Sequence, residues 1–158
     1  MSAAADRSQE VRRARAAARL AAVQAIFQME QSGQSVAAVQ TEFEDHRLGV
    51  GWGEGALAEA DSGIFRGAIA AAVDRQREID RLADRALAAA WPIDRIDPTL
   101  RALFRAAGAE LVTGEAPPRV IVTEYLDIAH AFFPGGREPA FVNGVLDHMA
   151  HAARPEAF

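Results

Sequence analysis

Residues 97–111 read DPTLRALFRAAGAEL, and this stretch decides the fold. Asp97 is a typical helix-capping residue and Pro98 suits the first helical turn, so the pair predicts where a helix begins. After it, apolar residues recur at intervals of three and four, which is the spacing of one buried helix face. The stretch therefore predicts an amphipathic helix whose core-facing side chains are Leu100, Leu103, Phe104, Ala107 and Leu111.

The same periodicity extends in both directions from this helix. Alanine is abundant and runs of β-branched residues are rare, which favours helices over strands. We therefore expect an all-α bundle of about seven helices with short loops, in a single domain that covers residues 1–158. The expected helices lie at about 8–31, 35–47, a long segment from 62 to Trp91-Pro92 with a break near Arg75, 98–112, 118–132, and from Pro139 onward.

The overall composition limits the kinds of protein that the chain can be. It has no cysteine, which excludes disulfides and thiolate metal sites. No apolar run approaches the ~20 residues that a membrane helix needs, and no apolar segment follows the first arginines as in a signal peptide. We therefore expect a cytoplasmic protein without a membrane segment. Residues 1–8 are expected to be disordered, and the glycine-rich residues 49–57 to form a flexible loop.

The first nineteen residues carry five arginines against only two acidic residues, although the whole chain has a net charge of −5. On a helix, Arg12, Arg15 and Arg19 share one stripe with the apolar positions 23 and 26. One stripe cannot be cationic and core-facing at the same depth. We therefore expect the core to begin near Leu20 and the earlier turns to project past the bundle. Such a segment suits phosphate binding, but a frayed, solvated terminus would have the same composition.

Motifs for catalysis and cofactor binding are missing from the sequence. There is no phosphate-binding glycine loop, no nucleophile elbow and no zinc-protease motif. His148 and His151 are three residues apart on one helical face, but a metal site there would need further ligands from elsewhere. We therefore expect no enzymatic activity, no cofactor and no metal.

Four separated stretches of the sequence carry specific motifs. Residues 141–147, FVNGVLD, are the most specific of them. The other three stretches are Arg12 to Ala25, Leu103 to Leu111, and Val120 to Ala129. Together they resemble the NusB family of bacterial transcription antitermination factors. The order and spacing of the four agree with the family over nearly the full length, whereas residues 34–60 agree only in being helical with a variable loop.

The resemblance implies a fold of two helical subbundles and a function in transcription. It implies binding to the boxA element of nascent ribosomal RNA transcripts, together with the small-subunit ribosomal protein that serves as NusE. Other Nus factors and RNA polymerase would be indirect partners. An alternative is a helical protein–protein interaction module without RNA affinity of its own, which the net acidity keeps open. NusB-like domains also occur fused to RNA cytosine methyltransferases, but this chain has no glycine-rich nucleotide loop.

The resemblance also implies which residues bind RNA. The arginines Arg12, Arg13, Arg15 and Arg19 fall where the family contacts RNA. Gln24 is expected either to bond a base or to be a polar edge of the bundle. Phe141 is expected either to stack on an unpaired base or to belong to the core.

Other positions near these residues are interpreted differently. Arg137 replaces a typically acidic or polar residue and is expected to add a phosphate contact. Asn143 and Gly144 are expected to serve the fold, the glycine by permitting a close backbone approach. Arg105 and Glu110 are expected to serve the fold or its surface charge.

Overall fold

The computed structural model describes residues 2–46, 61–87 and 91–158, and within these ranges the chain is helical without strands. This confirms the all-α prediction. The glycine-rich segment 49–57 lies outside the described residues. No described helix combines the length and the apolar character that crossing a membrane requires. The helices are α1 (Ala3–Ser32), α2 (Val36–His46), α3 (Ser62–Asp74), α4 (Gln76–Ala86), α5 (Pro98–Thr113), α6 (Pro118–Phe132) and α7 (Glu138–Ala153), with short 3-10 turns at Ile93–Arg95 and Pro155–Ala157.

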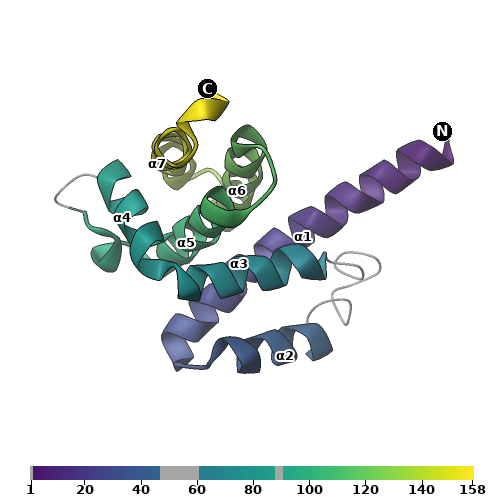
Figure 1. Cartoon of the computed structure of the whole chain (residues 1–158), viewed down its shortest axis with the longest axis horizontal. Helices are drawn as coiled ribbons and strands as arrows, with labels where there is room; N and C mark the ends of the chain where they lie inside the picture. Colours follow the sequence, from purple (N-terminus) through teal and green to yellow (C-terminus); the bar gives the residue numbers. More distant parts are fainter. Residues whose placement is uncertain (1, 47–60, 88–90) are drawn as a thin grey trace.

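The helices form two groups that share α5. Helices α1, α2 and α3 pack against one another on one side, whereas α4, α6 and α7 lie on the other (Figure 1). Helix α5 contacts α1 and α3 in the first group and α4, α6 and α7 in the second. The bundle is therefore built around the helix that residues 97–111 predicted.

Helix α5 is buried on all its sides rather than along one stripe. From Leu100 to Leu111 every residue is buried except Arg105, which is partly exposed. The helix begins as predicted, because the Asp97 carboxylate accepts a hydrogen bond from the backbone N–H of Thr99 at 2.7 Å. The small residues Ala102, Ala106 and Ala109 supply the additional buried surface. They were not part of the predicted face, because they lie off the single stripe that intervals of three and four residues define.

The other helix boundaries follow local signals in most places. Helix α3 ends at Asp74 and α4 begins at Gln76, which confirms the break near Arg75. Helix α1 begins at Ala3 instead of about Ser8, and the Ser2 hydroxyl caps it by accepting from the N–H of Ala5 at 3.2 Å. Helix α4 ends at Ala86, earlier than the Trp91-Pro92 boundary predicted for it.

Gly108 lies where α5 packs closely against α4 and α7. A Cβ atom at this position would lie 2.6 Å from Ile79 Cγ2 and 3.3 Å from Met149 Cε. Ile79 and Met149 belong to α4 and α7, and both are fully buried. A Cβ atom at position 108 would therefore clash with Ile79 of α4 and crowd the flexible end of Met149 of α7.

We expect Gly108→Ala to lower the free energy of unfolding by about 1 kcal/mol, because overpacking outweighs the gain in helix propensity. Gly144→Ala is a matched control, since a Cβ there has nothing within 4 Å. The control should be neutral or stabilising by up to about 1 kcal/mol. Urea unfolding measures both changes. A Gly108→Ala protein as stable as the control would contradict the close packing.

Candidate nucleic-acid interface

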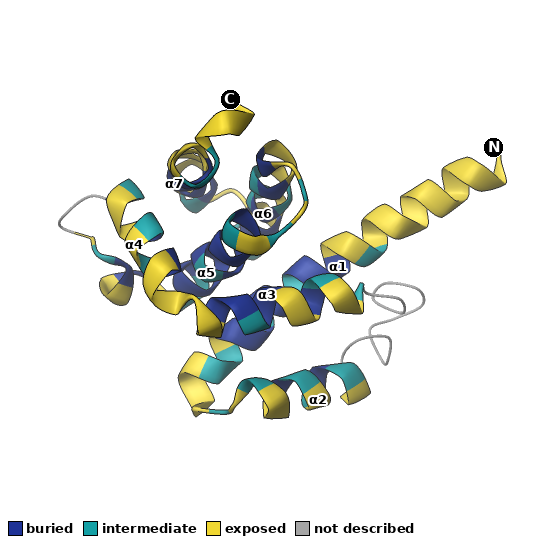
Figure 2. Ribbon diagram, viewed as in Figure 1, coloured by how far each residue is buried: buried dark blue, intermediate teal, exposed yellow. Residues whose placement is uncertain are grey.

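The first half of α1 stands clear of the bundle. We call residues 3–16 the overhang: each is exposed except Ala14, which is partly buried. Figure 2 shows this part of the helix in yellow, extending away from the blue core. The expected projection is therefore confirmed, although the core begins at Ala17 rather than near Leu20. An exposed helix that extends past its own domain leaves its side chains accessible to a partner.

Three of the predicted arginines lie on the overhang. Arg12, Arg13 and Arg15 are exposed. Among residues 2–46, 61–87 and 91–158, no carboxylate forms an ion pair with any of them. Exposed guanidinium groups without an ion pair can bind phosphate without first breaking a salt bridge inside the protein. They make the overhang the strongest candidate for a nucleic-acid contact.

Arg19 is placed differently from the expectation, because it belongs to the core. Its side chain is only 3% exposed and donates hydrogen bonds to both carboxylate oxygens of Glu110, the shortest from Nε to Oε2 at 2.9 Å and from Nη2 to Oε1 at 3.0 Å. The buried Tyr125 hydroxyl donates to the same Oε2 at 2.5 Å. Arg19 is thus occupied inside the protein, and we leave it out of the proposed RNA contacts.

The charge of this buried group is stabilised from several sides. Burial would lower the pKa of Arg19, but the hydrogen bonds and negative charge of Glu110 outweigh it and hold the pKa above its ordinary value. Burial and the nearby Glu110 carboxylate raise the pKa of Tyr125 well above its ordinary value. Arg19 therefore stays charged and Tyr125 stays neutral. The three side chains tie α1, α5 and α6 together just where the overhang leaves the core.

An open cleft of about 1060 Å³ lies beside the overhang. Arg12 and Arg15 line it from α1, and Arg119 lines it from α6. Its other walls come from the start of α3 and from the turn between α5 and α6. The lining also includes carboxylates, namely Asp61, Glu115 and Glu124 in addition to the paired Glu110.

Gln24 lies in a separate groove of about 470 Å³. Phe27 and Phe132 line the same groove, and Phe27 is 38% exposed. The Gln24 Oε1 atom is buried and has no hydrogen-bond partner among the described residues. An unsatisfied acceptor at a groove is suited to a donor from a ligand. Phe27 was not among the predicted site residues, because an aromatic residue at helical spacing normally indicates core.

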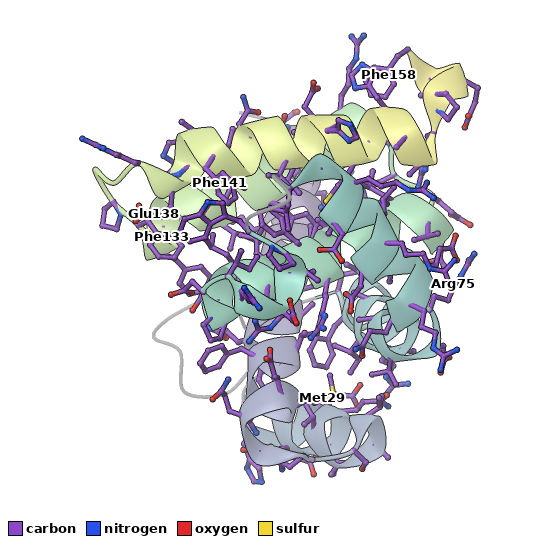
Figure 3. All side chains as sticks on the ribbon, turned by 90° about the vertical axis from the view of Figure 1, so that its left-hand side faces the viewer. Met29, Arg75, Phe133, Glu138, Phe141 and Phe158 are labelled. Atoms are coloured by element: carbon purple, nitrogen blue, oxygen red, sulfur yellow. The ribbon has the colours of Figure 1, made fainter. Side chains whose placement is uncertain are left out.

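Phe141 and Arg137 lie at the start of α7, in a third location. The Phe141 side chain is 41% exposed, and its ring packs edge-on against Phe104, with centroids 6.1 Å apart. The Phe141 ring is therefore partly packed against the core and partly open to solvent, and base stacking stays a prediction. Figure 3 shows Phe133, Glu138 and Phe141 together at this end of α7. Arg137 is exposed and has no ion pair within the described part of the chain.

Four further residues were expected to have structural roles, and the structure places two of them in ion pairs and two at the surface. Arg105 pairs with Asp80 at 3.0 Å, and Glu110 holds Arg19, so both serve the fold as expected. Asn143 and Gly144 are instead exposed. Among the described residues, no atom outside its own helix approaches within 4 Å of the Cβ position of Gly144. The expectation for Gly144 was therefore wrong.

Comparison with known proteins identifies the family. The model of the NusB family matches residues 16–151. "Transcription antitermination protein NusB" of Granulibacter bethesdensis is 47% identical over 152 residues, covering 92% of this chain and 93% of the relative. The protein of the same name from Maricaulis maris is 43% identical over 147 residues, with coverage of 92% and 91%. The solved structure of T. maritima NusB aligns with a TM-score of 0.68 at 26% identity, covering 89% of this chain and 94% of that one.

The chain therefore belongs to the NusB family. The family match begins at residue 16, which is the last residue of the overhang. Arg12, Arg13 and Arg15 thus precede the matched region, and the case for their function depends on their own exposure and charge.

Proposed function

We propose that this protein is a transcription antitermination factor that acts in the cytoplasm. It binds the boxA element of nascent ribosomal RNA together with the ribosomal protein NusE, and through other Nus factors it acts on RNA polymerase. The family and the names of the relatives support antitermination. The observation that carries RNA binding is the overhang, whose exposed arginines, Arg12, Arg13 and Arg15 among them, form no ion pair with a described carboxylate.

The distribution of charge favours a local contact over general binding to polyanions. The whole chain has a net charge of −5, so most of its surface repels phosphate. The overhang concentrates positive charge on one projecting helix. An RNA that binds there must place a few phosphates correctly, and it must obtain its remaining affinity from base contacts or from a protein partner.

The proposed base contacts are at the other two sites. Gln24 provides a buried acceptor beside the exposed ring of Phe27, and this pair suits a base that is not paired. The exposed part of Phe141 provides a second ring on which a base can stack. Arg137 adds a positive charge next to that ring. Our proposal is that these residues read the sequence of boxA, whereas the overhang holds its backbone.

The first test is the salt dependence of RNA binding. On single-stranded RNA the three contacts of Arg12, Arg13 and Arg15 should contribute about −2 to the slope of log K against log salt. Changing these three arginines together to glutamine should therefore reduce the magnitude of the slope by about 2. Fluorescence anisotropy with a boxA oligonucleotide, with and without NusE, measures both proteins.

A matched control is available on α4. Changing Arg77, Arg81 and Arg85 to glutamine removes the same charge from exposed positions that form no ion pair in the described ranges. This control should bind RNA like the wild type, and both variants should keep the wild-type melting temperature. The proposal fails if boxA binds no better than a scrambled oligonucleotide when NusE is present. Binding of NusE without any RNA affinity would favour the protein–protein interaction module instead.

A further inference from the structure

Arg119 is a cationic side chain of the cleft that lies outside the overhang. It is exposed on the first turn of α6, and none of the described carboxylates pairs with it. Its guanidinium carbon lies over the ring of Phe158, 5.7 Å from the centroid. Phe158 in turn stacks on His151, with centroids 3.7 Å apart and an interplanar angle of 18°. Phe158 thus supports an arginine at the edge of the cleft that no described carboxylate pairs with.

We propose that Arg119 is a further phosphate contact and that a single strand of RNA enters the cleft between the overhang and α6. Phe158 is a positioning residue that holds the Arg119 guanidinium against its ring. This inference rests on the proposed function, and it extends the bound RNA past the overhang to a second helix. Arg12, Arg15 and Arg119 line one cleft, so the same strand can meet all three.

The carboxylates in the cleft favour a nucleic acid over a simple polyanion. Asp61 is occupied, because its Oδ1 accepts from the Ile64 N–H at 3.0 Å. The Glu124 carboxylate lies 3.9 Å from the Arg19 guanidinium, whose positive charge partly offsets its negative charge. Glu115 is exposed and has no ion pair among the described residues. A polymer with only negative groups is repelled by Glu115, whereas a base can donate an amino or imino proton to it.

The same argument favours a single strand over a duplex. In a duplex the donors on the Watson–Crick edge are used by the partner strand. An unpaired base can turn that edge toward Glu115 or the exposed Thr123, while its phosphate faces the arginines. The cleft therefore combines the two kinds of group that single-stranded RNA presents.

Phe158 restricts where the arginine can go. A guanidinium over an aromatic face is held by the negative charge of the ring. The ring itself is fixed by His151, whose Nδ1 is 2.8 Å from the backbone oxygen of Asp147. The Arg119 head is thereby kept at the cleft rather than free in solvent. An aromatic substitute at position 158 should preserve this effect and an aliphatic one should not.

The test compares Arg119→Gln with wild type, using anisotropy of a boxA oligonucleotide extended at both ends. Loss of one phosphate contact should reduce the magnitude of the salt slope by about 0.7 and weaken binding about fourfold at 0.15 M salt. Arg81→Gln is the matched control, since Arg81 is exposed on α4 outside the cleft, and it should change nothing. Phe158→Ala should weaken binding in the same direction, and Phe158→Tyr should restore it.

The outcomes separate this inference from the proposed function. If Arg119→Gln binds like wild type while the overhang variant loses binding, the cleft is not on the RNA path and the proposed function stands. If the wild type does not distinguish boxA from a scrambled sequence, the proposed function fails and this inference fails with it. Equal losses for Phe158→Ala and Phe158→Tyr would overturn the positioning role. Equal weakening of heparin binding by Arg119→Gln would overturn the assignment to RNA.

Discussion

Replacing Glu110 with alanine is expected to lower the free energy of unfolding by about 3–5 kcal/mol. The reason is that the buried positive charge of Arg19 loses its hydrogen-bonded carboxylate. Arg19, at 3% exposure, would stay buried without its hydrogen-bonded partner and with only the more distant Glu124, 3.9 Å away, as a counter-ion, and the Tyr125 hydroxyl would lose its acceptor. Removing one member of a buried pair costs far more than the net contribution of the pair itself. Urea unfolding at neutral pH gives the value.

A smaller change to the same group provides the control. Tyr125→Phe removes only the hydroxyl that donates to Glu110 and leaves the hydrogen bonds from Arg19 in place. We expect a loss of about 1.5–3 kcal/mol, as for a hydrogen bond to a charged acceptor. If Glu110→Ala costs no more than Tyr125→Phe, then Arg19 finds water or another partner, and its assignment to the core would be wrong.

Phe104→Ala is expected to have an effect of similar size, about 3–5 kcal/mol. Phe104 is fully buried in α5, and its ring packs against the ring of Phe141. Truncation removes a large apolar side chain and leaves a cavity at the centre of the bundle, where five other helices prevent collapse. Thermal or urea unfolding of the variant measures the loss.

Phe141→Ala tests the same chemistry at a half-exposed site. The Phe141 side chain keeps 41% of its surface in solvent, so its removal should cost clearly less than the removal of Phe104. The Phe141 variant should lose RNA affinity instead, if the ring stacks on a base. An equal loss of stability in both variants would assign Phe141 to the core and remove it from the proposed interface.

The fold was predictable from the sequence because its signals are local. The cap at Asp97, the break near Arg75 and the helical periodicity each depend on residues a few positions apart. The complete burial of α5 was not predictable, because it depends on how many helices surround it. Alanine and glycine tolerate close packing as well as solvent, so Ala106 and Gly108 carry no signal in a hydrophobic pattern.

The candidate site was predictable only where it lies on one helix. The projection of the overhang followed from the conflict between charge and apolar positions on one stripe. Arg19 shares that stripe but was misplaced, since its partner Glu110 is 91 residues away in the chain. The cleft was not predicted for the same reason. Arg119 and Arg15 line the same cleft only because α6 packs against α1.

The continuity of α1 determines what ordering the overhang costs. A free peptide of this length would have to form the first turn of helix before anything could propagate, and that nucleation is unfavourable. Here residues from Ala17 onward are already helical within the core, so the exposed turns only extend an existing helix. The arginines are consequently presented with their spacing largely set before the transcript arrives. Association should therefore lose less conformational entropy than it would with a coil that folds on contact.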